Sequence, residues 1–428
     1  MVHPLFLRHI DAAPKARPDG KASTFGRRCA GAAARRGRAC LVGALAVLWA
    51  GPVGWAGPAG AAEPLSAMIE RDLAFARRQL ARTVAEVADV GRYPRATGPD
   101  GRWRTVGPED WTSGFFPGCL WLMFEATGAD RWRAWARAWT EGLAGQGANA
   151  GTHDLGFMIF TSFGAGHRLT GDPAYRDVVL GAARALASRY SPKVGAIRAW
   201  DWGPWRYPVI VDTMMNLELL FWAARNGGRA GWRALAAAHA RTTLAAHMRA
   251  DGGLYHLVDY DPESGAIRAK GTYQGRADGS VWARGQAWGL YGFALAYRET
   301  REARFLAAAR RAADHYLARL PPDHVPYWDF DAAGTPGAER DSSAAAIAAS
   351  GLLTLASLAG EHGRGYREAA ARTLRTLSSR RYLAPGAGSR GLLLHGVGHR
   401  PANREVDVSL IYGDYYFLEA LLRLRRGP

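Results

Sequence analysis

Cysteine is scarce in this chain, with three copies in 428 residues, and the common metal-binding motifs are missing. No C-x-x-C, H-E-x-x-H or EF-hand loop occurs, so neither a structural zinc nor a calcium site is predicted. No G-x-S-x-G motif marks a hydrolase serine, and the glycines lack the strand context of a nucleotide-binding loop. We therefore expect no metal and no cofactor.

The first 62 residues have the composition of an export leader. Arg35-Arg36-Gly37-Arg38 precedes an apolar run, Ala39 to Ala50, and small residues follow up to Ala62. A basic region, a short apolar region and an A-x-A-like site predict a secretory signal peptide, and the paired arginines also permit twin-arginine export. We expect a leader over 1–62, one catalytic domain over 63–428, and a periplasmic or secreted protein. A retained membrane anchor is the alternative.

The leader contains two of the three cysteines, which leaves Cys119 alone in the rest of the chain. One cysteine forms no intramolecular disulfide, and Cys119 sits in an apolar stretch, so we expect a buried small side chain.

The formal charge of +17 is spread unevenly. The leader holds nine Lys and Arg against two acidic residues, so 46 basic and 36 acidic side chains remain outside it. A basic surface favours anionic partners, although an arginine-rich genome explains the excess equally well. No Lys/Arg cluster interleaved with aromatics follows the leader, so nucleic acid is not predicted as a partner.

Beyond the leader, apolar and amphipathic stretches of helical length alternate, six of each. Apolar residues on every side indicate buried helices, and a one-sided pattern indicates helices that cover them. An inner ring of helices wrapped by an outer ring, an all-α (α/α)6 barrel in a single domain, accounts for this order. The apolar stretches begin at Trp111, Asp154, Asp212, Val281, Asp341 and Gly413. The amphipathic ones span 66–90, 131–145, 174–190, 232–249, 299–320 and 366–380.

Polar residues stand at the start of five apolar stretches, where a helix N-cap belongs. In a barrel of this kind the inner helices begin at one end, so these side chains converge on one cavity. The long connections 190–211 and 251–280 are expected to be its loops. The five residues are Asp110, Asp154, Asp212, Ser280 and Asp341.

Two of these residues, Asp154 and Asp212, are candidates for acid–base chemistry. An N-cap role, which contributes about 1 kcal/mol and no chemistry, is the alternative. Asp212 lies between two apolar runs, where poor solvation raises the pKa of a carboxyl. A desolvated acid beside a second carboxylate is one way to keep a proton donor at neutral pH.

Aromatic and polar side chains gather near the same loops. The chain has 16 tryptophans, and aromatic faces at a barrel mouth suit sugar rings. Arg284 is a candidate to hold a substrate carboxylate as a charged fork, with an ion pair inside the barrel as its alternative. The other candidates near the mouth are Trp111, Trp200, Trp202, Trp205, Trp282, Trp288, His153, His256, Gln274 and Gln286. We expect His324, His395 and His399 to be solvated or in turns.

Six motifs in this order resemble the unsaturated glucuronyl hydrolases, glycoside hydrolase family 88. They are WTSGFFPG at Trp111, HDLGF at His153, VDTMMN at Val211, WARGQAWGLYG at Trp282, DSSAAAIAASGLL at Asp341 and LIYGDYYFLEALLR near the C-terminus. The resemblance covers roughly 65–425 and implies an (α/α)6 barrel. It also implies hydration of the C4=C5 bond in Δ4,5-unsaturated uronic acid, at the non-reducing end of lyase-generated glycosaminoglycan fragments. An anionic unsaturated oligosaccharide is then the expected partner.

The resemblance gives the candidate residues unequal roles. Asp212 matches the general acid/base and Asp154 the second carboxylate. Arg284 matches a substrate-binding arginine, and His153, beside Asp154 in the HDLGF motif, is expected to bind substrate as well. Further substrate-binding positions match His256, Gln274, Trp111 and Trp288.

Two other functions stay open at this point. One is the related unsaturated rhamnogalacturonyl hydrolase activity on pectin fragments, which WARGQAW and His256 disfavour. The other is a non-catalytic periplasmic sugar-binding barrel, which the two intact aspartates disfavour.

Overall fold

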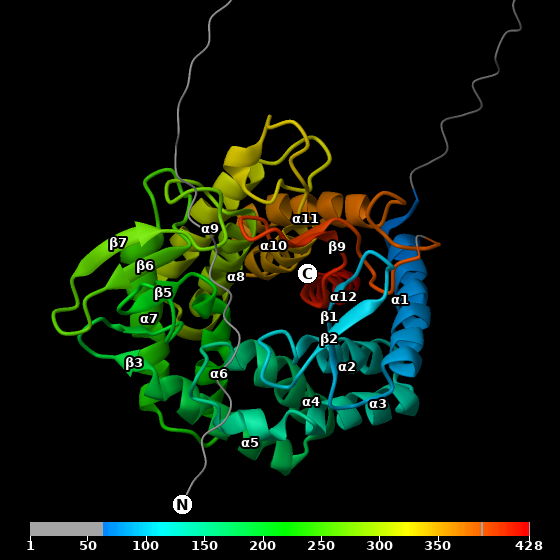
Figure 1. Ribbon diagram of the computed structural model, residues 1–428, viewed down its shortest axis with the longest axis horizontal. Helices are drawn as coiled ribbons and strands as arrows, with labels where there is room; N and C mark the ends of the chain where they lie inside the picture. The colour runs from blue at the N-terminus through cyan, green and yellow to red at the C-terminus, as the bar shows by residue number, and fades with distance from the viewer. Residues whose placement is uncertain (1–62, 387, 428) are drawn as a thin grey trace, which may run out of the picture. The chain divides into compact units, whose positions relative to one another are not determined.

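Helices alternate between an inner and an outer ring in the computed structural model, which describes residues 63–386 and 388–427 (Figure 1). The inner ring consists of α2 (Phe115–Thr127), η2 (Gly156–Gly164) with α4 (Ala165–Thr170), α6 (Thr213–Arg225), α8 (Ala283–Thr300), α10 (Ser342–Ala356) and α12 (Ile411–Arg426). The outer ring consists of α1 (Leu65–Val87), α3 (Asp130–Glu141), α5 (Pro173–Ser188), α7 (Gly231–His247), α9 (Ala303–Ala318) and α11 (Gly363–Leu377).

The inner ring closes on itself through contacts between neighbouring helices. Each inner helix packs against the next in chain order, and α12 returns to pack against α2. This confirms the (α/α)6 barrel expected from the alternation of apolar and amphipathic stretches. Residues 62–428 form one compact unit.

Burial differs between the rings as the sequence pattern predicts. In α10 all fourteen residues from Ser342 to Leu355 are buried, because helices surround it. In α11 the buried residues recur at helical spacing along one face, which packs on α10. The apolar inner helices therefore form the core, and the outer helices keep their arginines in solvent.

One inner helix departs from α geometry. The segment η2 is a π-helix of nine residues that runs into α4, and it begins two residues after Asp154. In a π-helix each backbone hydrogen bond joins residues five apart instead of four, and such segments are frequent at functional sites.

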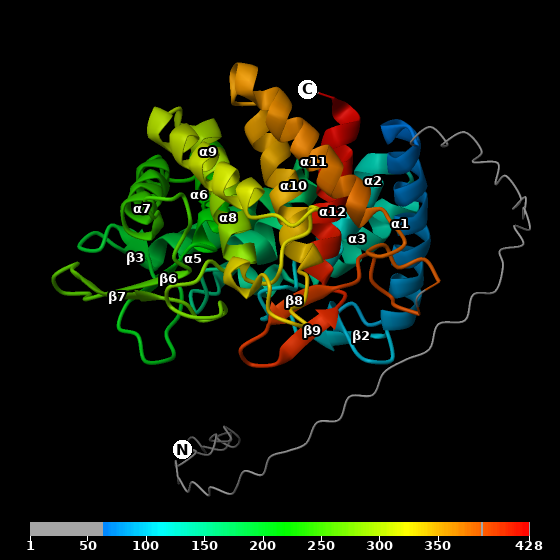
Figure 2. The ribbon, with the colours of Figure 1, turned by 90° about the horizontal axis from the view of Figure 1, so that it is seen from above.

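Short antiparallel strands, which the all-α expectation did not include, occupy the loops at one end of the barrel (Figure 2). β5 (Pro208–Ile210), β6 (Leu257–Tyr260) and β7 (Ile267–Gly271) form a three-stranded sheet. Three hairpins pair β1 (Tyr93–Thr97) with β2 (Trp103–Val106), β3 (Tyr190–Ser191) with β4 (Ala196–Ile197), and β8 (Gly396–His399) with β9 (Arg404–Val408). These strands stiffen the long loops around the cavity.

The predicted leader over 1–62 lies outside the described residues. Within 63–386 and 388–427, no helix is long and apolar enough to cross a membrane. Cys119 is buried and free, as expected.

Glycines set how closely inner helices approach each other. A Cβ placed on Gly292 of α8 would lie 2.4 Å from the Met214 Cβ of α6, and backbone atoms of Met214 follow at 3.1 Å. On the outer helix α11, a Cβ on Gly365 would meet nothing within 4 Å.

We expect Gly292→Ala to lower the free energy of unfolding by about 1–3 kcal/mol, because α6 and α8 must move apart. The matched control Gly365→Ala should raise it by about 0.5–1 kcal/mol, because alanine costs less backbone entropy in an open helix. Urea unfolding followed by circular dichroism measures both. Equal effects of the two substitutions would contradict the close approach of α6 and α8.

Candidate active site

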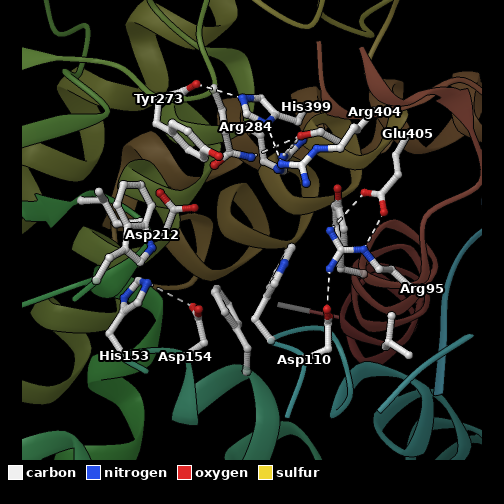
Figure 3. Close-up of a pocket in the computed structure, with 18 of the residues that line it drawn as sticks. Arg95, Asp110, His153, Asp154, Asp212, Tyr273, Arg284, His399, Arg404 and Glu405 are labelled. Carbon is white, nitrogen blue, oxygen red and sulfur yellow. Dashed lines mark hydrogen bonds and ion pairs between the residues drawn. The ribbon is translucent and has the colours of Figure 1, made fainter. Parts of the chain in front are cut away.

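A cavity of about 470 Å³ opens at the barrel end where the inner helices begin (Figure 3). In Figure 3 Asp154 and Asp212 lie on one side of it, and Arg95, Asp110 and Glu405 lie across from them. The convergence of helix starts expected from the sequence is therefore present. The charged lining residues are Arg95, Asp110, Asp154, Asp212, Arg284, Arg404 and Glu405; the aromatic and other polar ones include Trp111, His153, Phe157, Trp200, Trp202, Tyr273, Gln274, His399 and Tyr412.

The helix-start residues divide into caps and free carboxylates. Asp341 accepts hydrogen bonds from the backbone N–H groups of Ser343 and Ala344 and so caps α10. Asp212 occupies the N-cap position of α6, but its side chain accepts no capping hydrogen bond. The N-cap alternative is thus wrong for Asp212 and correct for Asp341.

Two more helix-start residues differ from expectation. Asp110 accepts from the N–H of Thr112 in the turn before α2, at 2.9 Å. Ser280 does not cap α8, whose N-cap is Trp282; its hydroxyl instead donates to Asp329 at 2.7 Å.

Asp212 is a buried carboxyl at the end of the short turn between β5 and α6. Its side chain is 13% exposed, and its Oδ2 has no hydrogen-bond partner among the described residues. Burial raises its pKa from 3.8 to about 7, and the charge of Arg284 offsets part of that rise. Asp212 therefore holds a proton over much of the neutral range.

A neutral histidine faces the Asp212 carboxyl. The Nδ1 atom of His256 accepts hydrogen bonds from the backbone N–H of Tyr273, at 3.2 Å, and of Gln274, at 3.4 Å. Burial, and then the charge of Arg284, lowers the pKa of His256 well below 6.5. The imidazole proton thus resides on Nε2, which lies 3.5 Å from Oδ2 of Asp212. His256 thus presents a neutral N–H toward Asp212 without a hydrogen bond between them in this structure, and it does not itself line the cavity.

Asp154 is the second buried carboxyl. Burial raises its pKa to about 7, and repulsion from Asp212 adds to that rise. His153 lies beside it with its Nε2 3.4 Å from Oδ1, and burial lowers the pKa of His153 to about 3, so this imidazole is neutral. The ionisation of Asp154 is therefore coupled to the charge of Asp212.

The starts of η2 and α6 are tied together under the two carboxyls. Asn216 of α6 accepts from the N–H of Phe157 at 3.0 Å, and His153 Nδ1 lies 2.9 Å from the hydroxyl of Thr213. These contacts hold Asp154 and Asp212 on one rigid support.

Arg284 lines the cavity and is also ion-paired, so both alternatives considered for it hold in part. Its Nη1 lies 3.2 Å from Asp341 Oδ2, and it donates to the carbonyls of Val397 and Gly398. The guanidinium is 4.4 Å from the ring centroid of Trp282. Its orientation is thereby fixed before any substrate binds, and substrate binding by Arg284 stays a prediction.

A second cationic group was missed from the sequence. Arg95 of β1 lies 2.6 Å from Asp110 and 2.5 Å from Glu405, whereas Arg404 of β9 has no carboxylate partner among the described residues. These residues sit at opposite ends of the chain and outside any helical pattern, so no local signal marks them.

His399 corrects an expectation. Instead of being a solvated loop residue it is buried on β8, with Nε2 2.9 Å from the Tyr273 carbonyl and Nδ1 3.2 Å from Arg404. His395, in contrast, is exposed and pairs with Asp407 at 2.6 Å.

The tryptophans separate into cavity walls and core. Trp111, Trp200 and Trp202 line the cavity, and the latter two stack at 4.7 Å with 51% of Trp202 exposed. Trp288 is fully buried against Phe157 and is absent from the lining, so its expected contact with substrate has no support here.

Of the two candidate glutamines, only Gln274 lies at the cavity. Gln274 lines the cavity and donates to the Gly398 carbonyl at 3.2 Å. Gln286 is buried away from it and donates to the carbonyls of Gly252 and Ala312. Across the described ranges, no group of three or more His, Cys, Asp or Glu side chains is arranged to hold a metal.

Comparison with known proteins gives consistent matches over most of the chain. The model of Glycosyl Hydrolase Family 88 matches residues 78–393. An unsaturated glucuronyl hydrolase of Formosa agariphila is 43% identical over 324 residues, which is 74% of this chain and 80% of that protein. An unsaturated chondroitin disaccharide hydrolase of Streptococcus pyogenes is 36% identical over 342 residues, 77% of this chain and 85% of the relative.

The fold gives the same match. The crystal structure of an unsaturated glucuronyl hydrolase specific for heparin superposes with a TM-score of 0.81 at 41% identity, covering 84% of this chain and 97% of the other. The cavity with its paired aspartates, the closed double ring of helices and these similarities agree, and the chain belongs to glycoside hydrolase family 88.

Proposed function

We propose that this glycosidase acts on Δ4,5-unsaturated uronic acid at the non-reducing end of glycosaminoglycan oligosaccharides. The observation that carries the proposal is the pair of carboxyls, Asp154 and Asp212, which serve as no helix cap and whose pKa values burial raises to about 7. A carboxyl that stays protonated at neutral pH is the group that a C=C bond needs as its proton donor.

Hydration of the C4=C5 bond follows from this arrangement. Asp212 donates its proton to C4, and the same carboxylate then takes a proton from the water that adds at C5. The resulting hemiketal collapses, opens the ring and releases the next sugar. The rule that relates carboxylate separation to inversion or retention does not apply, because the anomeric carbon is not attacked.

The neighbours of Asp212 support this role. The Nε2–H of His256 faces the carboxyl at 3.5 Å, and Arg284 stabilises the carboxylate that remains after proton transfer. Asp154 opposes loss of the proton through its own negative charge.

Substrate charge and shape match the rest of the lining. Arg404 and Arg284 form a cationic wall suited to the uronate carboxylate. The stacked pair Trp200 and Trp202 at the mouth suits the apolar face of the following sugar. The basic excess outside residues 1–62 agrees with anionic substrates, and the sequence of those residues supports export.

The activity is measured through the C=C bond, whose ultraviolet absorbance disappears on hydration. With unsaturated disaccharides from chondroitin, hyaluronan and heparin we expect the absorbance to fall, and Asp212→Asn should slow the reaction by about 10²–10⁴-fold. The control variant is Arg77→Gln, which changes an exposed residue of α1 far from the cavity lining and should leave the rate unchanged.

Other outcomes of the same assay overturn the proposal. Persistent absorbance with every substrate would refute hydration of the C=C bond. Cleavage of saturated glycosides would show instead that the enzyme is a conventional glycosidase that attacks the anomeric carbon. Reaction with pectin-derived fragments alone would favour a rhamnogalacturonyl hydrolase.

The pH profile should report the carboxyl pair. Because burial raises the pKa of Asp212 to about 7, its protonated form is lost as pH rises through that value, and kcat/KM should fall on the alkaline side of about pH 7. In Asp154→Asn the neighbouring negative charge is absent, so the alkaline limb should move to lower pH. An alkaline limb that stays in place in this variant would contradict the coupling.

The same pKa shift predicts a stability effect. A carboxyl whose pKa is raised on folding, from 3.8 to about 7, binds its proton more tightly in the folded state, so stability falls as pH rises between these values. Asp212→Asn removes this cost, and we expect its Tm at pH 8 to exceed that of the parent by several degrees. At pH 4 the two melting temperatures should nearly coincide. A lower Tm for Asp212→Asn than for the parent at pH 8 would refute the claim that the ionised Asp212 carboxylate destabilises the folded state.

A further inference from the structure

Two outer helices, α9 and α11, lie side by side on the barrel wall (Figure 2). The Tyr366 hydroxyl of α11 donates to Asp314 of α9 at 2.8 Å, which joins them directly. Each outer helix starts at the barrel end opposite the active-site cavity, because the inner helix before it ends there. The pair thus presents a continuous outer face that contributes no lining residue to that cavity.

Charge is concentrated on this face. Helix α9 carries three arginines and one acidic residue, and α11 carries four arginines and one acidic residue. The outer helices α1 and α3 together carry the same number of arginines, seven, but five acidic residues. The outer helices α5 and α7 are also poor in acids, with four arginines and one acidic residue, but they carry fewer arginines than the seven of α9 and α11.

Most arginines of the face have no carboxylate partner. Within the part of the chain that the structure describes, Arg304 pairs with Glu302 and Arg364 with Glu368. Three others reach only backbone carbonyls, which orient a guanidinium without neutralising it. The five arginines of the pair without an ion pair are Arg310, Arg311, Arg367, Arg372 and Arg375.

Two hollows flank α11. One, of about 420 Å³, lies between α9 and α11 and has Arg310, Arg372 and His362 in its lining; its one carboxylate, Asp314, is bound by Tyr366. The other, of about 660 Å³, lies between the start of α11 and the ends of α10 and α12. Five arginines line this second hollow; four of them are ion-paired, and Arg367 has no carboxylate partner among the described residues.

We propose that this α9–α11 basic face, defined by the seven arginines of the two helices, is a docking surface for a sulfated glycosaminoglycan chain. Guanidinium groups bind sulfate and carboxylate through paired N–H donors, and unpaired arginines do so without first breaking an ion pair. A polymer with one or more charges per sugar matches a row of arginines along a helix.

Polysaccharide fits this face better than nucleic acid does. Single-stranded nucleic acid binds through aromatic side chains on which bases stack. The aromatic residues of α9 and α11, namely Phe305, Tyr316 and Tyr366, are all buried. The choice of glycosaminoglycan rests on the proposed function, because it is the polymer from which the substrate of the active site is released.

Docking is tested with heparin chains that have saturated ends, which offer the active site no C=C bond. We expect Arg372→Glu with Arg375→Glu, two exposed arginines of the face without an ion pair, to raise the Kd at moderate salt by about tenfold, because sulfate contacts and counterion release are lost. Arg77→Glu with Arg78→Glu on α1 is the matched control. Both of its arginines are exposed and form no ion pair with a described residue, and the change in charge is equal.

Isothermal titration calorimetry over a series of salt concentrations provides the readout. A weaker affinity in the α11 variant, together with a Kd of the α1 control within twofold of the parent, supports the docking surface. Equal losses in both variants show a general charge effect and overturn it, as does the absence of a loss in either. Duplex DNA that binds as tightly as heparin and responds equally to the α11 variant also overturns it.

Hydrolysis of an unsaturated disaccharide, measured in parallel, reports whether each variant is folded. A variant that fails this check is replaced by Arg372→Gln with Arg375→Gln, for which we expect a smaller increase of Kd. If the parent chain itself lacks hydrolysis, the proposed function fails, while the binding comparison still decides the docking surface.

Discussion

A buried ion pair between Arg284 and Asp341 connects the elements on which the active site depends. Its partners are 1% and 0% exposed and lie 3.2 Å apart at the starts of α8 and α10. Asp341 also caps α10, and Arg284 binds two carbonyls of β8. Removing either partner would leave a buried charge unpaired, which costs about 3–5 kcal/mol. The pair thus fixes two inner helices and one cavity strand at once.

The same guanidinium sets the electrostatics of the cavity. Its positive charge lowers the pKa of both Asp212 and His256, and burial acts on the two groups in opposite directions. His256 is therefore held neutral, while the pKa of the Asp212 carboxyl stays near 7, within the physiological range. A single fixed cation in this way allows a neutral donor and a protonatable carboxyl to face each other.

Sequence patterns predicted the barrel well, because buried and half-buried helices differ along their whole length. The two aspartates were also located, since residues at helix starts converge in a closed ring. Asp212 and Asp341 look alike in sequence, however, and only three-dimensional contacts reveal that one caps a helix and the other does not. The same limit applies to Trp288, whose burial depends on its neighbours in η2 and α12 rather than on its own segment.

The cavity residues that lie on β-strands could not be predicted from the sequence. Arg95, Arg404 and Glu405 lie on hairpins too short to show a pattern, and they meet only because the ring of helices closes between α12 and α2. Ring closure joins segments about 310 residues apart. Local periodicity carries no information about such pairs.

The π-helical start of the second inner helix makes the site sensitive to chain length. Asp154 precedes η2, and α4 follows it without a break. Deleting one residue from η2 would let the segment relax into α geometry, but each residue turns a helix by about 100°. Asp154 would then rotate away from Asp212 while the barrel wall behind it stayed intact. The placement of Asp154 beside Asp212 thus depends on the hydrogen-bonding pattern of η2, which the rest of the barrel does not require.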